Sequence, residues 1–245
     1  MNLLLLDPSD LDASSEARLD GRRARHVLEV LRCAPGDRIG VGLLGGRLGE
    51  AEVLAVSKDA LHLRAILTRE PPSPSRVSLL LALPRPKILR KVLQATAAMG
   101  VKRLVLVGSY RVEKSYWGSP ALAPEALAQE LRLGLEQGRD TLLPEVSLRR
   151  FFKPFVEDRL DADLPGARRL ADPHAAGPLE ATPPPAGGAG VTLAVGPEGG
   201  WTAYEAAELA RRGFLPFTLG ERALRVDQAV PFAVGQAELW LRGGR

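Results

Sequence analysis

A glycine-rich turn carries the residues in this chain that are best suited to hold a ligand. It reads Gly196-Pro197-Glu198-Gly199-Gly200 and follows Val191 to Val195, a short apolar run whose β-branched residues favour a buried strand. Glycines in a strand-to-helix turn let the backbone approach a ligand closely, and the N-terminus of a following helix adds N–H donors. The turn therefore predicts a binding site made largely of backbone groups.

The residues of the turn also limit the class of ligand. The turn matches neither G-x-x-x-x-G-K-[ST] nor G-x-G-x-x-G, and Glu198 brings a negative charge that would repel a phosphate. A carboxylate beside exposed backbone N–H and C=O groups suits a nucleoside or a cationic ligand better. A plain connection between strand and helix, with Glu198 in solvent, is the alternative, and this turn alone leaves both open.

A second turn further along the chain favours the ligand site. Phe214 to Leu219 is another apolar run; it ends at Gly220 and leads to Leu224-Arg225-Val226-Asp227. Between the two turns, Thr202 and Glu205 have the spacing of a helix capping box. Two strand–turn–helix units in succession place both turns at carboxyl ends of strands, where open α/β sheets bind their ligands.

Together the two turns resemble the signature of SPOUT-class RNA methyltransferases. Within that class, the chain is most similar to the family that methylates N3 of a uridine in bacterial small-subunit (16S) ribosomal RNA. The resemblance covers the whole chain, because shorter motifs match the family's N-terminal RNA-binding barrel and its middle segments. These motifs are His26-Val27-Leu28-x-Val30-Leu31-Arg32 with Pro35-Gly36-Asp37, Leu93-Gln94 with Met99-Gly100-Val101, and Glu136-Gln137-x-Arg139 with Pro144-Glu145.

The resemblance implies a fold, a cofactor and an oligomeric state. The implied fold is α/β: a C-terminal SPOUT-type trefoil-knotted domain with a mostly parallel sheet, preceded by a small PUA-like β-barrel. The knotted domain is expected to bind S-adenosylmethionine in a bent form, and the chain to form an obligate homodimer. The implied cofactor-binding residues are Leu193, Val195, Gly196, Pro197, Glu198, Gly199, Gly200, Leu219, Gly220 and Leu224.

Two residues after the second turn are the catalytic candidates. Methyl transfer from a sulfonium is an in-line displacement, so most of the catalysis should come from holding the reactants aligned. Uridine N3 must lose a proton as it attacks; our hypothesis is that Asp227 accepts this proton, directly or through water. Arg225 would stabilise negative charge on the uracil O2 and O4. A helix N-cap role for Asp227 and a phosphate-binding role for Arg225 are the alternatives.

The chain departs from the family pattern close to these candidates. Where the family reads L-G-x-x-I-L-R-x-E-T-A, this chain has Ala223, Asp227 and Gln228. The aspartate keeps the charge but shortens its reach by one methylene. Two alternatives therefore stay open: a non-catalytic RNA-binding or ribosome-assembly factor on the same fold, and a SPOUT methyltransferase that acts on another RNA position.

Basic residues are concentrated in one stretch of the chain. Between Pro71 and Pro120 there are nine lysines and arginines against Glu113 alone, although the net charge of the whole chain is only +4. Such a block predicts a surface that faces RNA phosphates, with a solvated face as the alternative. The predicted RNA-binding residues are Arg85, Lys87, Arg90, Lys91, Arg111 and Lys114 in this stretch, Arg22, Arg25 and Arg32 in a predicted N-terminal helix, and Arg139.

Aromatic residues are interleaved with the basic ones between Arg111 and Gly118. The segment reads R-V-E-K-S-Y-W-G, a composition that suits RNA backbone contact combined with base stacking. A surface loop whose Trp117 packs inward is an equally good interpretation.

Composition excludes several classes of protein. With 45% hydrophobic and 25% charged residues among 245, the chain is typical of a globular protein with room for a sizeable core. A single cysteine excludes an internal disulfide and a cysteine-based metal cluster, and the three histidines are not at ligand spacing, so we expect no metal. The apolar run from Met1 to Leu6 is too short for a signal segment, and no run approaches the ~20 apolar residues of a membrane span. We expect a cytoplasmic protein.

A proline-rich stretch, Glu70-Pro71-Pro72-Ser73-Pro74-Ser75, predicts a linker between two domains. The first domain is expected over residues 1–70 and the second over residues 76–245. The first should hold a helix at 22–31 and strands at 39–41, 47–56 and 61–67. In the second, strands are expected at 77–83, 104–107, 168–172, 191–195 and 214–219, and helices at 87–99, 120–137, 202–213 and 227–241.

Overall fold

The computed structural model describes residues 3–243, except for the side chains of Arg22, His26, Val30 and Leu31. Its contacts divide the chain into two units: Met1–Ser73 with Arg132–Leu143, and Pro74–Leu131 with Pro144–Arg245. The boundary after Ser73 lies inside the proline-rich stretch. From the sequence, segment 132–143 was expected in the second domain, but its contacts group it with the first unit. One of these contacts is a hydrogen bond from the Gly45 N–H to the Thr141 carbonyl at 2.8 Å.

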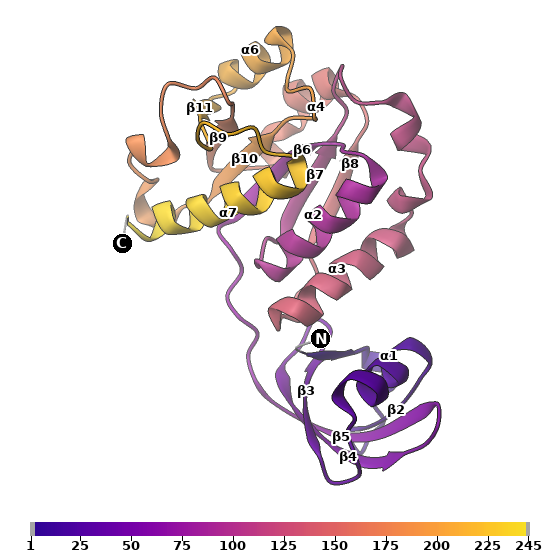
Figure 1. Ribbon diagram of the computed structural model, residues 1–245. Helices are drawn as coiled ribbons and strands as arrows, with labels where there is room; N and C mark the ends of the chain where they lie inside the picture. Colours follow the sequence, from indigo (N-terminus) through magenta and orange to yellow (C-terminus); the bar gives the residue numbers. More distant parts are fainter. Residues whose placement is uncertain (1–2, 244–245) are drawn as a thin grey trace. The chain divides into compact units, whose positions relative to one another are not determined.

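The first unit is a curled five-stranded sheet (Figure 1). Its strands are β1 (Leu4–Leu6), β2 (Glu16–Asp20), β3 (Arg38–Leu43), β4 (Leu48–Val56) and β5 (Ala60–Arg69), in the spatial order β1-β3-β4-β5-β2. β1 pairs with β3 in parallel and the other neighbours are antiparallel. Alternate residues of β4 and β5, such as Val53 and Leu63, point into one apolar core, which is the alternation expected of a sheet covered on one face.

One helical segment packs into this core. It begins as α1 (Gly21–His26), continues as the π-helical turn η2 (Val27–Leu31), and buries Ala24 and Val27. The expected helix at 22–31 and the three expected strands are therefore present. β1 and β2 were not expected, because the first is short and the second contributes only Ala17 and Leu19 to the core. A short 3-10 turn, η1 (Pro8–Asp10), connects them.

The second unit contains a six-stranded sheet in which every neighbouring pair is parallel. The spatial order is β11 (Leu215–Phe217), β9 (Ala167–Ala171), β10 (Val191–Val195), β6 (Val77–Ala82), β7 (Arg103–Val107) and β8 (Glu145–Arg149). The central strands β6 and β10 are continuous apolar runs, as expected of strands covered on both faces. β8, an edge strand with a charged residue at each end, was not expected from the sequence.

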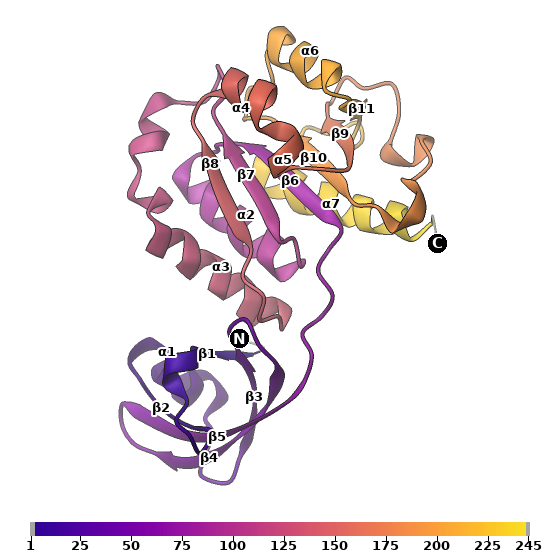
Figure 2. The same cartoon turned by 180° about the vertical axis from the view of Figure 1, so that it is seen from behind.

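Helices cover both faces of this sheet. α2 (Pro86–Ala98) and α7 (Val226–Arg242) lie side by side on one face, and α7 also packs on β10 and β6 (Figure 1). α4 (Phe152–Asp158) and α5 (Leu160–Asp163) cover the opposite face (Figure 2), where their apolar residues form one core with Leu209 of α6 (Ala203–Arg211). Of the aromatic residues at 151–155, Phe152 and Phe155 enter that core, whereas Phe151 is 68% exposed.

The segment between β7 and β8 folds as two 3-10 turns and a helix. The turns are η3 (Lys114–Gly118) and η4 (Pro120–Leu122), and the helix is α3 (Pro124–Gly138). The helix expected from Pro120 begins later because the Ser119 hydroxyl accepts a hydrogen bond from the Ala121 N–H and closes a separate turn. Two further 3-10 turns, η5 (Leu179–Ala181) and η6 (Ala186–Gly188), lie between β9 and β10. No helix in the described part of the chain is long and apolar enough to cross a membrane.

Candidate ligand-binding and catalytic site

A cavity of about 680 Å³ opens where three neighbouring parallel strands end. Its wall includes the loop after β9 (171–174), the glycine turn after β10 (195–200) and the turn after β11 (219–220). The strands end together because β10 and β11 both align with β9, Ala194 beside Leu170 and Phe217 beside Ala171. Both the position and the volume are typical of small-molecule sites in α/β sheets.

Most residues that the sequence proposed for cofactor binding meet in this wall. Nine of the ten line the cavity: Val195, Gly196, Pro197, Glu198, Gly199, Gly200, Leu219, Gly220 and Leu224. The exception is Leu193, which is fully buried in β10, two residues before the turn. Trp201 and Leu170 also line the cavity; they were not proposed, because an apolar residue beside a turn carries no signal that separates a cavity wall from a core.

The glycines of the wall are favoured by close neighbours and by their backbone angles. A Cβ atom on Gly196 would lie 3.1 Å from Cδ1 of Trp201, and one on Gly199 would lie 3.2 Å from Cδ of Arg111. Gly200 and Gly220 have φ values of +72° and +114°, which side chains rarely adopt. The backbone is therefore exposed to the cavity at the positions where the sequence predicted it.

Glu205 connects the glycine turn to the loop after β7. The capping box expected from Thr202 and Glu205 is present: the Glu205 carboxylate accepts a hydrogen bond from the Thr202 N–H at 2.9 Å. Its other oxygen accepts a hydrogen bond from the Tyr110 N–H at 2.8 Å, a contact that no local sequence pattern predicts. Because Glu205 is only 3% exposed, these hydrogen bonds compensate for burying its charge.

Arg111 holds the glycine turn from that same loop. Its guanidinium donates hydrogen bonds to the carbonyl oxygens of Gly199 and of Trp201, the latter at 3.4 Å, and its side chain lines the cavity. The sequence proposed Arg111 for RNA binding. In the structure it also supports the wall of the site.

The two catalytic candidates lie at the start of α7, and their surroundings differ. Arg225 lines the cavity and its side chain is 71% exposed, whereas the side chain of Asp227 is 7% exposed and does not belong to the cavity wall. The Arg225 Nε lies 3.6 Å from Oδ1 of Asp227. The N-cap of α7 is Arg225, so the alternative role of Asp227 as N-cap is wrong. Gln228 takes part in this cap: its side-chain oxygen accepts a hydrogen bond from the Arg225 N–H at 3.3 Å.

A lysine of α2 contacts Asp227 and lowers its pKa. The Lys91 Nζ donates a hydrogen bond to Oδ2 of Asp227 at 3.0 Å, and this contact lowers the pKa of Asp227; burial opposes it, and the positive charge of Arg225 supports it. The other oxygen, Oδ1, is buried and has no hydrogen-bond partner among the described residues. Asp227 is thus an ionised carboxylate held between Lys91 and Arg225, and its Oδ1 accepts no hydrogen bond among the described residues.

The residues proposed for RNA binding fall into two groups. In the second unit, Lys87 and Lys114 are exposed, but Arg90 pairs with Glu130 at 3.6 Å, Lys91 with Asp227, and Arg85 with Glu198 at 4.0 Å. Part of the predicted basic surface is therefore neutralised within the unit. Of the proposed RNA-binding residues in the first unit, Arg25, Arg32 and Arg139 are exposed. The side chain of Arg22 lies outside the described residues.

Comparison with known protein families decides the class of this protein. Residues 71–238 match the model of the RNA methyltransferase domain. The chain belongs to the RNA methyltransferase family. Residues 19–66 of this methyltransferase match the RNA methyltransferase PUA domain, in agreement with the expected PUA-like barrel.

Individual relatives of the methyltransferase match over its whole length. Ribosomal RNA small subunit methyltransferase E from Treponema pallidum is 27% identical over 99% of this chain and 94% of the relative. Among solved structures, a ribosomal RNA small subunit methyltransferase E from Neisseria gonorrhoeae, bound to S-adenosyl methionine, superposes with a TM-score of 0.76 and 23% identity over 98% of both chains. A Legionella pneumophila structure in complex with bound SAM also has a TM-score of 0.76, at 21% identity over 97% of both chains. At these identities the structures establish the shared fold.

Proposed function

We propose that this methyltransferase transfers a methyl group from S-adenosylmethionine to N3 of a uridine in the ribosomal RNA of the bacterial small subunit. The observation that carries the proposal is the cavity at the ends of β9, β10 and β11, with Arg225 in its wall. The name of the Treponema pallidum relative and the ligand of the Neisseria gonorrhoeae structure support the substrate and the cofactor. The target atom rests on the resemblance of the two turns to the uracil-N3 family. Such a substrate implies a cytoplasmic protein.

The cavity has features that fit S-adenosylmethionine. Residues 195–200, 219–220 and 222–224 line a volume suited to a nucleoside with a short side chain. Trp201 adds an indole ring to the wall, and its buried Nε1 has no hydrogen-bond partner among the described residues. The carboxylates of Glu198 and Asp172 suit ribose hydroxyls and the positive charges of the methionine part.

The residues at the start of α7 supply the remaining chemistry. When bound, S-adenosylmethionine presents an electrophilic methyl group, and the RNA base must lose its N3 proton to accept it. Asp227 accepts this proton, directly or through water; its Oδ1 has no hydrogen-bond partner among the described residues and lies 3.6 Å from the Arg225 Nε at the cavity wall. The carboxylate is ionised at neutral pH, and the hydrogen bond from Lys91 lowers its pKa further below the usual 3.8. The exposed guanidinium of Arg225 stabilises the negative charge that develops on the uracil oxygens.

We also propose that the second unit is a trefoil-knotted domain that forms a homodimer through α7. Support for the knot comes from topology: β10 lies between β9 and β6, and the chain then returns to pack α7 against α2. Support for the dimer comes from an apolar stripe on α7. Phe232 and Leu239 are two turns apart on one face of the helix, and they are 48% and 66% exposed.

Transfer of labelled methyl from S-adenosylmethionine to small ribosomal subunits that lack the modification tests the function. Label in 3-methyluridine after nucleoside chromatography is the expected result. Label in another nucleoside would keep the methyltransferase and discard the target. RNA binding without label would instead favour a non-catalytic RNA-binding or assembly factor.

An Arg225→Ala variant tests the catalytic assignment. It should lose roughly 10²-fold in turnover at saturating substrates, the scale of one lost charge-stabilising donor. Arg211→Ala removes an equal charge from α6, where Arg211 contacts Glu208, and serves as the control. Equal rates for Arg225→Ala and the parent would refute the role of Arg225.

A further inference from the structure

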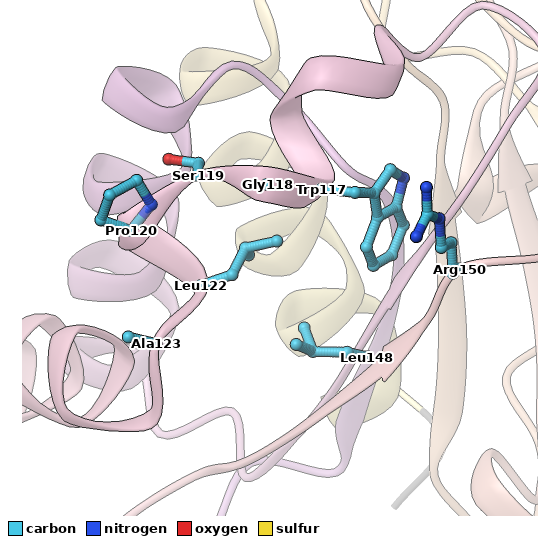
Figure 3. A pocket seen from close by; sticks show the side chains of 8 residues that line it. All are labelled: Trp117, Gly118, Ser119, Pro120, Leu122, Ala123, Leu148 and Arg150. Atoms are coloured by element: carbon cyan, nitrogen blue, oxygen red, sulfur yellow. The ribbon is translucent and has the colours of Figure 1, made fainter.

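A second cavity, of about 490 Å³, lies in the second unit and shares no lining residue with the first. It is bounded by the segment from η3 to the start of α3 and by the carboxyl end of β8. Figure 3 shows the Trp117 indole and the Arg150 guanidinium at one end of this cavity, with Leu122 and Leu148 pointing toward its interior. Ser119 adds a hydroxyl group to the wall.

A glycine brings the two sides of this cavity together. Gly108 follows β7, and its N–H donates a hydrogen bond to the Arg149 carbonyl at 2.9 Å. A Cβ atom at this position would lie 2.0 Å from the Arg150 carbonyl oxygen and 3.6 Å from Cζ2 of Trp117. Any other residue would therefore separate the loop after β7 from the end of β8. The close approach holds the Trp117 ring beside Arg150.

The wall combines the groups that bind an unstacked base. A half-buried indole offers a flat face, two leucines add apolar surface, and a guanidinium supplies planar donors and a positive charge. No carboxylate of the described residues forms an ion pair with Arg150, whose guanidinium lies 6.0 Å from the centre of the Phe151 ring. An apolar protein partner would leave this charge without a counterpart, whereas a nucleotide supplies both a ring and a phosphate.

We propose that this cavity binds one unpaired nucleobase of the substrate RNA, stacked on Trp117 with its phosphate near Arg150. The proposal rests on the proposed function, because it takes RNA as the substrate. Arg111 belongs to the wall of the first cavity and Trp117 to the wall of the second, so one short segment serves both. The bound base belongs to the same RNA as the methylated uridine, and the cavity contributes to RNA affinity.

Binding of a fluorescein-labelled, single-stranded RNA decanucleotide of mixed sequence tests the proposal. The Trp117→Ala variant should bind at least about fivefold more weakly than the parent, the lower end of what one lost stacking contact costs, and Trp117→Phe should lie between the two. Arg150→Ala should weaken binding and reduce its salt dependence. Arg103→Ala is the control, because it removes the same charge from the exposed amino end of β7 and should weaken binding less.

Two further measurements make the outcome unambiguous. The RNA should quench tryptophan fluorescence in the parent. The part of this quenching that is lost in Trp117→Phe comes from Trp117, and this comparison does not depend on the stability of Trp117→Ala. Calorimetric binding of S-adenosylmethionine tests the first cavity separately and should be unchanged in both Trp117 variants. RNA affinity of Trp117→Ala equal to that of the parent, or undiminished quenching in Trp117→Phe, overturns the nucleobase cavity even if methyl transfer is observed. Weaker RNA binding by Trp117→Ala than by the parent supports the nucleobase cavity even if the parent protein itself does not bind S-adenosylmethionine.

Discussion

The ammonium group of Lys91 lies 3.0 Å from the carboxylate of Asp227 and joins the middle of α2 to the first turn of α7. The sequence assigned these residues to different tasks, RNA binding and proton transfer. Their contact makes Lys91 a positioning residue for Asp227: it orients the carboxylate and lowers its pKa. This relationship leads to the first prediction.

Lys91→Met should lower kcat roughly tenfold at saturating RNA, less than the ~10²-fold expected when a general base is lost. Without the lysine, the pKa of Asp227 rises toward its ordinary value, so the acid limb of the pH–rate profile should move to higher pH. Lys87→Met is the matched control, because Lys87 lies one turn earlier on α2 and is exposed. If both variants change only the affinity for RNA, Lys91 does not position Asp227.

Replacing Gly220 with alanine should weaken binding of S-adenosylmethionine. Gly220 has a φ of +114° and lines the first cavity, so a side chain strains the second turn. Gly213→Ala provides the comparison: Gly213 has a φ of +82° at the end of α6 but does not line the cavity. Both variants should lose about 1 kcal/mol of unfolding free energy. In calorimetry only Gly220→Ala should bind the cofactor more weakly; equal affinities would exclude this turn from the site.

Glu205→Ala should reduce both stability and cofactor binding. The substitution leaves the Tyr110 and Thr202 N–H groups without their acceptor, a loss of roughly 1–3 kcal/mol. It also frees the loop that carries Arg111. Glu208→Ala, on the same helix, removes an ion pair with the exposed Arg211 and a hydrogen bond with the exposed Tyr204, and should change stability by less than about 1 kcal/mol. Urea unfolding and calorimetry distinguish the two; similar unfolding curves for both variants would argue against the connecting role of Glu205.

The first unit should lose stability in acid partly through Asp7. A hydrogen bond from Arg132, at 3.0 Å, lowers the pKa of Asp7 below its usual 3.8, with burial opposing and Arg23 assisting. A carboxylate whose pKa is depressed in the folded state stabilises the fold above its unfolded pKa, and this contribution disappears as pH falls through the folded value.

Urea unfolding between pH 2.5 and 6 measures this effect. Asp7→Asn should be less stable than the parent at pH 6, and the difference should shrink below about pH 3.8. Asp59→Asn is the control, because Asp59 is exposed in the turn between β4 and β5. A difference between Asp7→Asn and the parent that does not depend on pH would contradict the assignment.

Charged residues on the outer face of α7 should separate the proposed homodimer. In Phe232→Lys with Leu239→Lys, two lysines replace the exposed apolar residues at the proposed interface. Sedimentation velocity should show a dimer for the parent and a monomer for the double variant. Leu215→Lys, which replaces a 49% exposed leucine on the edge strand β11, should remain dimeric. A parent protein that sediments as a monomer would refute the dimer.

Local signals in the sequence predicted the elements that they control directly. The continuous apolar runs became β6 and β10, and Thr202 with Glu205 forms the expected capping box. These features depend on residues a few positions apart, so their physical causes are visible in a single segment. β1 and β8 were not foreseen, because a short strand is stabilised mainly by hydrogen bonds to a distant neighbour.

By itself, the sequence located two glycine turns at the ends of apolar strands, because positive φ angles such as those of Gly200 and Gly220 are a property of the glycines themselves. Only the tertiary structure decided which side chains complete the site at these turns. Arg111 reaches a carbonyl 88 residues away, and Lys91 reaches a carboxylate 136 residues away. A basic residue in a basic stretch has the same local pattern whether it faces RNA or a carboxylate, and its partner is chosen by the packing of α2, α7 and the parallel sheet.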